Sequence, residues 1–326
     1  KTVLITGGAG SIGSVILELC LKNQVKKIIC IDSSEYNTYK LIQKVGTNKI
    51  AFETGDIKDY EMMNFYFKRY KPDIVFHAAA LKHVNIQETN LRNSLLTNFF
   101  GTDKILQLSI KYNIEDFVLI STDKAVEPSN NMGLSKRLAE LLAIDYASSC
   151  NMNISIVRFG NVIGSSGSVL NHFSALIKDK KDIMITDKKV KRFFMSIREA
   201  CYLVLESINN SKHNCQIFMI DMGEEILIKD IAEKLIILNG LKVNKDINIV
   251  FGKLKKGEKI SEKLKYDFEK SLKTQTDKLL ALEVHNPRES IDFELFKKNL
   301  EDLIYKNSIS STKIESMIIN EIKNFI

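Results

Sequence analysis

The sequence is poor in proline, and it contains no long apolar run. Its three prolines, Pro72, Pro128 and Pro287, are too scattered to form a proline-rich linker between domains. No stretch approaches the roughly 18 consecutive apolar residues that a membrane-spanning helix needs, and no signal peptide is recognisable. We therefore expect a globular segment without a membrane span of its own.

Cysteine is also scarce. The five cysteines are an odd number, and none of them has the spacing of a zinc site. Most lie in apolar or helical stretches, which is typical of buried, reduced thiols. We therefore expect a reducing, cytoplasmic environment and predict no metal site. The cysteines are Cys20, Cys30, Cys150, Cys201 and Cys215.

The charge balance is mildly basic, with 47 Lys and Arg residues against 40 Asp and Glu residues and a formal net charge of +7. The basic residues are scattered rather than gathered in a stripe, so nucleic acid is not an expected partner. The excess favours acidic small-molecule substrates or an anionic surface nearby.

The length of 326 residues suits about two domains, and no internal repeat is present. The chain begins at Lys1, and an apolar strand follows at once. We therefore expect a segment of a longer polypeptide that starts just before its catalytic domain.

Apolar strands alternate with amphipathic helices through the first half of the chain. This alternation is typical of an α/β fold with a doubly wound parallel sheet of the Rossmann-like kind. The expected strands span residues 2–6, 27–32, 50–57, 73–80, 117–121 and 153–159.

The composition changes after about residue 165. We predict a dinucleotide-binding domain over residues 1–165. Residues 166–326 are predicted to form mainly a smaller C-terminal substrate-binding lobe over the sheet edge, with the chain crossing back, and a helical tail. The elements expected there are helices over 171–180, 197–209 and 308–326 and strands over 216–221 and 246–251.

A glycine-rich turn joins the first strand to the first helix. Gly7, Gly10 and Gly13 permit a tight turn and close backbone approach, with Ser11 and Ile12 between them. The free N–H groups and the positive dipole end of the following helix are suited to a pyrophosphate. The turn therefore predicts a dinucleotide cofactor.

Two acids follow strands at the same predicted edge. Asp32 ends the second strand, where a carboxylate accepts hydrogen bonds from the adenosine ribose hydroxyls. No arginine follows in residues 33–35, beginning with Ser33, so NAD is preferred over NADP. Asp56, followed by Ile57, is suited to the adenine amino group or to capping the next helix, and both readings stay open.

The fourth strand runs into small residues, Ala78, Ala79 and Ala80, which would let a cofactor lie across the sheet edge. Lys82 follows as a candidate for both cofactor and substrate. His83 is expected to be structural rather than a catalytic base. Asn98, in a helix expected over residues 95–112, is a further cofactor candidate.

The chemical centre is predicted in the loop after the fifth strand. This loop carries Thr122, Asp123 and Lys124, and it leads into a helix that starts near Met132 and bears Lys136. Open α/β sheets bind ligands at the carboxyl ends of their strands, where this loop begins. The alternative for Asp123 and Lys124 is a solvated turn pair.

Several short stretches resemble a known family. Together with the glycine turn and its acids, they are similar to the extended short-chain dehydrogenase/reductase superfamily. Within it they resemble the UDP-N-acetylglucosamine 4,6-dehydratases of bacterial surface-polysaccharide and protein-glycosylation pathways. The matching stretches span residues 121–126, 131–137, 158–162, 192–195 and 257–259.

The chain departs from the superfamily pattern at two places. The superfamily usually has Tyr four residues before the helix lysine, and here that position is Met132. In the resembled group this replacement marks large, membrane-anchored dehydratases, which implies a cytoplasmic catalytic domain at the inner membrane and a homo-oligomer. Lys255 and Lys256 stand where relatives usually carry Arg-Pro, and lysine lacks the bidentate fork of arginine.

The resemblance implies a role for each centre residue. Asp123 is the acid for the C6 hydroxyl, Lys124 the C5 base, and Thr122 the hydrogen-bond partner of the C4 oxygen. Lys136 holds the nicotinamide ribose, and its charge together with burial favours the neutral amine that Lys124 needs to act as a base. Met132 cannot take a proton, so the usual tyrosinate is missing.

The resemblance also suggests residues for the UDP-sugar. Arg192 could equally form a structural ion pair, so its role stays open. The substrate candidates are Lys82, Thr122, Asn161, Ser168, Val169, Arg192, Lys255 and Glu258.

Two other functions remain open at this point. A 4-epimerase of the same superfamily would also retain its NAD, although epimerases normally need the missing Tyr. A non-catalytic NAD-sensing protein would also lack that Tyr, but it would have no use for Asp123, Lys124 and Lys136.

Overall fold

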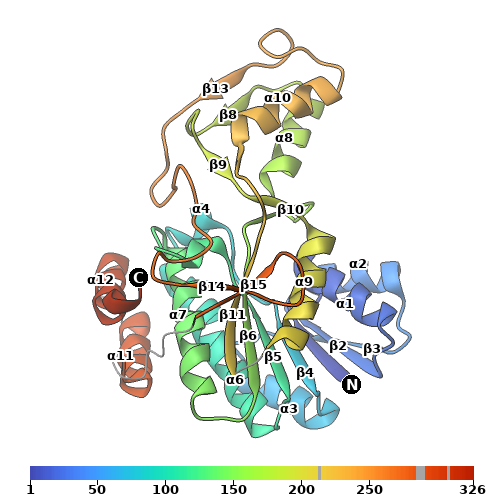
Figure 1. Cartoon of the computed structure of the whole chain (residues 1–326), viewed down its shortest axis with the longest axis vertical. Helices are drawn as coiled ribbons and strands as arrows, with labels where there is room; N and C mark the ends of the chain where they lie inside the picture. Colours follow the sequence, from blue (N-terminus) through green and yellow to red (C-terminus); the bar gives the residue numbers. More distant parts are fainter. Residues whose placement is uncertain (212–213, 284–290, 307–308) are drawn as a thin grey trace.

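A large sheet is covered by helices on both faces, and a smaller lobe sits at one end of it (Figure 1). The computed structural model describes residues 1–211, 214–283, 291–306 and 309–326. Pro287 and Ser308, the first residue of the expected tail helix, lie outside the described residues. Within those ranges, none of the helices combines the length and apolar character needed to cross a lipid bilayer.

The main sheet of the described residues has the strand order β14-β15-β11-β6-β5-β4-β1-β2-β3. The strands from β11 to β3 run parallel, and β15 and β14 add antiparallel strands at one edge. The predicted doubly wound parallel sheet is therefore confirmed. The bounds are β1 Thr2–Thr6, β2 Lys27–Asp32, β3 Ile50–Thr54, β4 Ile74–His77, β5 Asp116–Ile120, β6 Asn153–Arg158, β11 Cys215–Ile220, β14 Ser271–Lys273 and β15 Leu279–Leu282.

The strand order reverses between β1 and β4. Ile5 of β1 pairs with Cys30 of β2 on one side and with Phe76 of β4 on the other. The chain thus moves outward through β2 and β3 and returns to the opposite side of β1. In doubly wound sheets the crevice at the carboxyl ends of such strands is where ligands bind.

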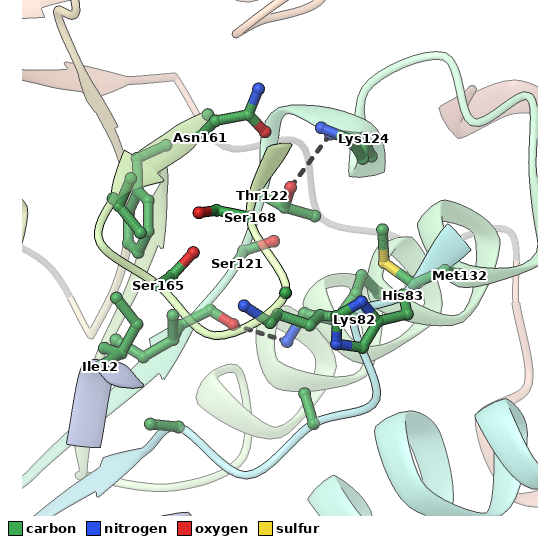
Figure 2. A pocket seen from close by; sticks show the side chains of 18 of the residues that line it. Ile12, Lys82, His83, Ser121, Thr122, Lys124, Met132, Asn161, Ser165 and Ser168 are labelled. Atoms are coloured by element: carbon green, nitrogen blue, oxygen red, sulfur yellow. Dashed lines mark hydrogen bonds between the residues drawn. The ribbon is translucent and has the colours of Figure 1, made fainter. Parts of the chain in front are cut away.

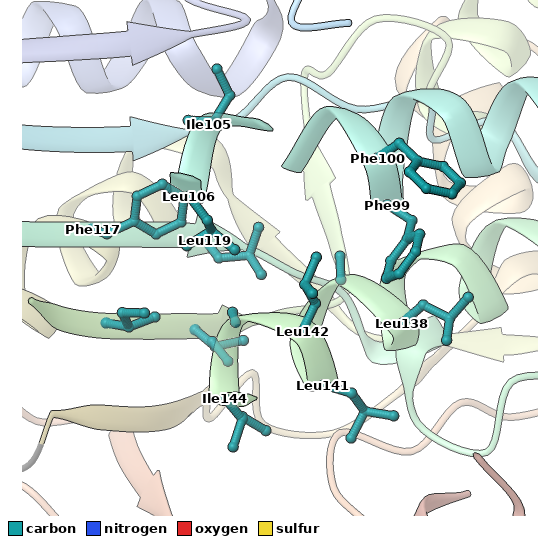
Figure 3. Close-up of a cluster of buried hydrophobic side chains, with 14 of the residues drawn as sticks. Phe99, Phe100, Ile105, Leu106, Phe117, Leu119, Leu138, Leu141, Leu142 and Ile144 are labelled. Atoms are coloured by element: carbon teal, nitrogen blue, oxygen red, sulfur yellow. The ribbon is translucent and has the colours of Figure 1, made fainter. Parts of the chain in front are cut away.

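Alternate residues of the central strands enter two different cores. Val3 and Ile5 belong to the core on one face, and Leu4 belongs to the core on the other. Successive side chains of a strand point to opposite faces of the sheet. Because helices cover both faces, the residues of these strands are apolar without interruption. Figure 3 shows the second core, where Phe99 and Phe117 lie among leucines of α6 and α7.

Helices α1, α2 and α9 supply residues to the first core, and α3, α6 and α7 supply residues to the second. Helix α7 is buried on nearly all sides, so its apolar stripe at Leu138, Leu141 and Leu142 belongs to the core. The bounds are α1 Ser11–Lys22, α2 Glu35–Val45, α3 Tyr60–Tyr70, α4 Val84–Gln87, α5 Leu91–Ser94, α6 Thr102–Lys111, α7 Asn131–Ala147 and α9 Ile197–Asn210.

Two C-terminal helices, α11 (Phe293–Tyr305) and α12 (Ser311–Ile322), lie beside α7 (Figure 1). Ile314, Ile318 and Ile322 recur at four-residue intervals, so they share one helix face, and that face enters the second core. A short 3-10 turn, η4 (Lys323–Phe325), follows. The tail is therefore part of the main body.

The small lobe has its own core, in which Phe173, Ile183 and Ile231 are buried. It contains α8 and α10 and two-stranded pairs in which β8 pairs with β13 and β9 with β12, and β7 pairs with β10 beside it. The bounds are α8 Val169–Lys178, α10 Ile228–Leu238, β7 Asn161–Ile163, β8 Ile183–Ile185, β9 Lys191–Arg192, β10 Phe194–Ser196, β12 Ile226–Leu227 and β13 Ile249–Phe251.

Three elements differ from the sequence expectations. The strand expected over 216–221 in the lobe is β11, which extends the main sheet beside β6, and α9 packs against α1 beneath it. The third strand ends at Thr54, short of Asp56. The helix expected over 95–112 begins as a π-helix, η1 (Leu95–Gly101), before α6.

Candidate active site

The glycine turn is shaped by close backbone contacts. Gly7 has φ +63°, and a Cβ there would lie 2.7 Å from the Cα of Ala79. A Cβ on Gly13 would overlap the carbonyl oxygen of Gly7. Gly10 is the N-cap of α1, and no side chain of the described residues caps that end. The N–H groups there are therefore directed at the crevice and suited to an anion.

Asp32 is buried and holds this turn in place. Its carboxylate accepts hydrogen bonds from the backbone N–H groups of Ala9 (3.0 Å) and Ser34 (2.9 Å). The neighbouring Ser33 is exposed. Each carboxylate oxygen can accept a further bond, so the predicted ribose contact of Asp32 stays a prediction.

Asp56 does not cap a helix, so that alternative is wrong. The N-cap of α3 is Asp59, whose side chain accepts from the N–H of Met62. The carboxylate of Asp56 instead accepts from the N–H of Lys58 at 2.9 Å. Ile57 is buried in the second core, against Gly101, rather than facing the crevice.

A cavity of about 300 Å³ opens at the carboxyl ends of β4, β5 and β6 (Figure 2). It brings together predicted site residues from six separate stretches of sequence. Those that line it are Ile12, Ala78, Ala80, Lys82, Thr122, Lys124, Met132, Lys136, Asn161, Ser168 and Val169. Lining residues that were not predicted are Leu81, His83, Ile120, Ser121, Phe159, Gly160, Val162, Ser165, Gly167 and Phe194.

Asp123 and Lys124 form a close pair at the wall of this cavity. Asp123 is completely buried, and 15% of the Lys124 side chain is exposed. The Nζ of Lys124 lies 2.9 Å from Oδ1 of Asp123, and the hydroxyl of Thr122 donates to the same oxygen at 2.8 Å. The alternative of a solvated turn pair is therefore wrong.

Oδ2 of Asp123 is buried and has no hydrogen-bond partner among the described residues. A Cβ on Gly160 would lie 3.1 Å from it, so this oxygen lies close to the cavity wall. An unpaired buried carboxylate oxygen is costly. Its position next to the cavity suits a hydroxyl group of a ligand.

Lys136 lies on the cavity floor and donates to the carbonyl oxygen of Ile120 at 2.5 Å. Burial lowers the pKa of its ammonium to about 8, although the charge of Glu140 opposes this. Met132, one turn earlier on α7, lines the same cavity with its thioether. The described wall therefore has no phenol at the position next to Lys136.

Asn98 lies behind the cavity rather than in its wall. It is fully buried and exchanges two hydrogen bonds with the backbone of Leu81, at 2.8 and 2.9 Å, and donates to Ser135. Its role in this structure is to fix the loop that follows β4. The predicted direct cofactor contact is therefore not supported by its position.

Residues 164–168 lie across the crevice. The Nζ of Lys82 donates to the carbonyl oxygen of Ser166 at 2.9 Å, and the N–H of Ser166 donates to the hydroxyl of Ser11. Burial lowers the pKa of Lys82. His83 contacts Gly167, whose φ is +68° and whose Cβ position would overlap the imidazole. His83 therefore packs against this segment and also lines the cavity, and its structural role stays a prediction.

Three predicted diphosphate residues interact with one another outside the cavity wall. Arg192 donates to the carbonyl oxygens of Lys191 and Ile260, and its guanidinium lies 3.8 Å from Glu258. Glu258 also accepts from Thr186 and from the N–H of Lys255, whose side chain is exposed. The ion-pair alternative for Arg192 is what the structure contains.

Glu262 is a buried residue of the site that the sequence analysis missed. Its Oε1 lies 3.8 Å from the Nζ of Lys124, and only 4% of its side chain is exposed. In the sequence it stands among lysines, including Lys259 and Lys263, which favours a solvated surface. Only the fold brings this segment beneath Asp123 and Lys124.

A second charged cluster lies next to the first. Arg158 is fully buried and pairs with Glu140 and Glu269, each at 2.8 Å. Glu140 also accepts from Ser121 and Arg137. Burial alone would raise the pKa of Glu140, but the ion pair and hydrogen bonds with Arg158 lower it to about 2.

Comparisons with known proteins agree with this architecture. Residues 3–284 match the model of a family described as polysaccharide biosynthesis protein. The chain belongs to this family.

Two curated members of similar sequence are the probable polysaccharide biosynthesis protein EpsC of Bacillus subtilis and the capsular polysaccharide biosynthesis protein CapD of Staphylococcus aureus. Both are 38% identical, over 269 and 271 residues respectively, which is 81% of this chain but 45% of each relative. The chain thus spans less than half the length of these polysaccharide biosynthesis proteins.

Solved structures show the same fold. Pen from Bacillus thuringiensis is 32% identical, with a TM-score of 0.79 over 86% of this chain and 89% of its own. Two more distant neighbours are a dTDP-glucose 4,6-dehydratase, DesIV from Streptomyces venezuelae, at 18% identity (TM-score 0.74, 100% and 98% covered), and a UDP-glucose 4-epimerase from Thermotoga maritima at 22% (0.73, 82% and 90%). The predicted Rossmann-like α/β fold is confirmed.

Proposed function

We propose that this chain is the catalytic part of an NAD-dependent enzyme that converts UDP-N-acetylglucosamine to a UDP-4-keto-6-deoxy-N-acetylhexosamine by 4,6-dehydration. The proposal rests above all on the buried Asp123–Lys124 pair beside the cavity. A carboxylic acid and an amine held 2.9 Å apart are the acid and base that removal of water across C5 and C6 requires.

The residues present fit NAD. The glycine turn, the uncapped N-terminus of α1 and the small residues after β4 leave room for a dinucleotide at the strand-order reversal. DesIV and the Bordetella bronchiseptica enzyme WbmH share this fold and were solved with NAD bound. NAD, when bound, supplies a hydride acceptor for sugar C4 and the hydride that C6 later receives.

The two members of the pair act on adjacent carbons of the sugar. Lys124, as a neutral amine, removes the C5 proton, and Asp123, as an acid, protonates the C6 hydroxyl so that it leaves as water. These transfers leave a carboxylate and an ammonium, which is the ion pair found at 2.9 Å. The unpaired Oδ2 of Asp123 lies behind Gly160, which lines the cavity, so it must become exposed to the cavity when the substrate binds before it can hydrogen-bond the C6 hydroxyl.

Thr122 and Lys136 act at the other reacting carbon. Thr122 hydrogen-bonds the C4 oxygen and donates to Asp123, so it connects the C4 hydroxyl to the acid. Lys136 holds the nicotinamide ribose, and its charge favours removal of the C4-hydroxyl proton. Around the rest of the cavity, Lys82, Asn161, Ser168 and Val169 bind the UDP-sugar.

The second candidate is a UDP-sugar 4-epimerase. Relatives named UDP-glucose 4-epimerase, such as that of Rickettsia canadensis, are 36% identical over 219 residues. An epimerase has no use for an acid–base pair at C5 and C6, and Met132 stands in place of the tyrosine base. The Asp123–Lys124 pair therefore favours dehydration.

Mass spectrometry separates the candidates. The purified chain, incubated with UDP-N-acetylglucosamine and no added NADH, should release a product lighter by one water. An unchanged mass with a new sugar configuration would instead indicate epimerisation. An unchanged substrate would support the non-catalytic, NAD-sensing alternative.

The organisation of the protein is also a proposal. We propose that residues 1–165 bind the cofactor, that residues 166–326 form most of the substrate lobe, and that the chain forms homo-oligomers. One relative at 38% identity is named an uncharacterized membrane protein, MJ1061 of Methanocaldococcus jannaschii. That name supports a catalytic domain held at a membrane by a longer protein, and we propose that it lies on the cytoplasmic face.

A further inference from the structure

Two buried carboxyl groups share one ammonium group beneath the cavity. Lys124 lies 2.9 Å from Oδ1 of Asp123 and 3.8 Å from Oε1 of Glu262. Oδ2 of Asp123 and Oε2 of Glu262 are the buried side-chain oxygens of the described residues that have no hydrogen-bond partner. Two ionised carboxylates in this position repel each other, so a proton on one of them relieves the repulsion.

The contacts form a continuous line from the cavity to Glu262. The hydroxyl of Thr122 lies 2.8 Å from Asp123, Asp123 lies 2.9 Å from Lys124, and Lys124 lies 3.8 Å from Glu262. The first two links are hydrogen bonds, whereas the third is an ion-pair contact, so the Lys124 ammonium must move toward Glu262 before a proton can pass. Glu262 is therefore the buried end of a path that begins at the sugar hydroxyl next to Thr122.

Few charged groups surround Glu262 besides this pair. Lys259, on the same segment, lies 4.0 Å from its Oε2, and Arg192 of β9 also exerts its charge there. Both cations have other partners, because Lys259 donates to the carbonyl oxygens of Val126 and Glu127 and Arg192 pairs outside the cavity. Glu262 thus stays close to Lys124 without a dedicated ion-pair partner.

The proposed reaction creates a need for a third proton site. Dehydration takes one proton from the C4 hydroxyl and places one proton on the departing water. Between these events Asp123 must be an acid while Lys124 is a neutral base. The pair then holds one proton, so the proton released at C4 needs another place.

We propose that Glu262 is this third site: its carboxylate takes up a proton when the C4 hydroxyl is deprotonated, and it later returns a proton to Lys124. The inference rests on the proposed dehydration. Glu262 acts through Lys124 and does not touch the sugar, so it is a positioning residue for the base.

The protons balance over one turnover. At the start the three groups hold one proton, on Lys124. The C4 proton raises the total to two, which reside on Asp123 and Glu262 while Lys124 is neutral. The C5–H bond then breaks toward Lys124, its electron pair forms the C5=C6 double bond, and the C6–O bond breaks as Asp123 protonates the leaving oxygen. When C6 receives the hydride returned by NADH and C5 is protonated again by Lys124, Glu262 passes its proton to Lys124, and the first state returns.

The surroundings of Glu262 favour such proton uptake. Burial raises the pKa of its carboxyl group; the charge of Lys124 opposes this, and the charge of Asp123 adds to the rise. A raised pKa means that the group keeps its proton to a higher pH than an exposed glutamate does. A glutamate in water would be too acidic to hold the proton.

The first test measures the proton directly and needs no turnover. Carboxyl-carbon NMR of the NAD-loaded protein, labelled at glutamate carboxyls, should show one signal that titrates above the ordinary glutamate value of about 4.3. The Glu262→Gln variant should lack that signal, which assigns it. If Glu262 titrates at or below the ordinary value, the proposal is overturned whatever reaction the enzyme catalyses.

The second test measures turnover of UDP-N-acetylglucosamine. Glu262→Gln keeps the shape of the side chain but cannot exchange the proton, so kcat should fall about 100-fold, as for other groups that transfer protons, with little change in KM. Added formate should partly restore kcat to Glu262→Ala. Wild-type kcat in Glu262→Gln, or failure of formate to restore any activity, would show that Glu262 only fills space.

Glu225→Gln provides the matched control. The side chain of Glu225 is only 8% exposed and accepts from Ser261 and from the N–H of Glu262, but its carboxylate pairs with Lys191 rather than with Lys124. This variant should keep kcat near the wild-type value. If the wild-type chain dehydrates no UDP-sugar, the proposed function fails, and the NMR titration still decides whether Glu262 holds a proton.

Discussion

Two buried charged clusters lie side by side in this protein, and they differ in how completely their groups are paired. In the cluster of Arg158, Glu140 and Glu269, both carboxylates have cationic partners within 3 Å. In the cluster of Asp123, Lys124 and Glu262, each carboxyl group has one oxygen without a partner.

The difference separates a structural role from a chemical one. A satisfied buried network fixes the parts of the fold that it connects, because breaking it leaves a bare charge. A half-satisfied network costs stability and persists where its free atoms serve a ligand or a proton. The segment that carries Tyr266 links the two, since the Tyr266 hydroxyl donates to the carbonyl oxygen of Ala125 and the Tyr266 N–H donates to Glu269.

The largest effect is expected from Lys124→Ala. The loss of the base should lower kcat by about 10²- to 10⁴-fold. The free energy of unfolding should fall by less than in Arg158→Met, because Lys124 is the partly exposed member of its cluster, whereas Arg158 is fully buried between two carboxylates. Steady-state assays and urea unfolding measure the two quantities. Lys263→Ala is the control, since Lys263 is half exposed and pairs with Glu127 and Asp267.

Asp123→Asn should give a loss of similar size. If Lys124→Ala and Asp123→Asn both kept near-normal turnover, the assignment of acid and base would be wrong. If both instead unfolded the protein, the contrast between the clusters would disappear.

Arg158→Met should lower stability strongly and kcat only slightly, the reverse of Lys124→Ala. It leaves the carboxylates of Glu140 and Glu269 without their main partner, which should lower the free energy of unfolding by about 3–5 kcal/mol. Any folded fraction should retain substantial kcat, because Arg158 does not line the cavity. Arg198→Met, at an exposed position on α9, should change stability by less than about 0.5 kcal/mol.

The free energy of unfolding should depend on pH through the fully paired cluster of Arg158, Glu140 and Glu269. Because the pKa of Glu140 is lowered to about 2, its pairing contributes stability that is fully present above the unfolded value of about 4.3 and is lost as pH falls through about 2. The loss should amount to about 3 kcal/mol. Urea unfolding of the wild type at a series of pH values from about 5 to about 2 measures it.

The acid-induced loss should be smaller in Glu140→Gln, which is less stable at pH near 5 and has no carboxylate to protonate. An equal slope in the two proteins would mean that other carboxylates govern acid unfolding. The paired cluster would then have no special part in stability.

Much of the main sheet could be predicted from sequence because it depends on local patterns. The glycine turn, the small residues after β4 and the apolar strands carry their own signals, and Asp32 and Lys136 lie where those signals place them. The π-helical start of η1 carried no such signal. The sequence predicts a strand over 216–221 but not the sheet that it joins. Its pairing with β6 is a long-range contact, which the local pattern does not contain.

The charged site residues were less predictable for the same reason. Arg192 and Glu258 are near each other in space but far apart in sequence, and their pairing with each other could not be read from either stretch. Glu262 is buried in a segment that Tyr266 and Glu269 hold against Ala125, Arg137 of α7 and Arg158 of β6. Charge partners in a fold are set by tertiary contacts, which a single sequence does not display.

The smallest effect on turnover is expected from Met132→Ala. The thioether lines the cavity beside Lys136 but exchanges no proton, so kcat should fall by less than about tenfold. Removing a buried methionine side chain should still cost about 2–5 kcal/mol of stability, which unfolding in urea would measure alongside the assay. A loss of kcat larger than that of Lys124→Ala would mean that the position next to Lys136 takes part in the chemistry. In that case Asp123 and Lys124 would not be the acid and base that act in place of the missing tyrosine.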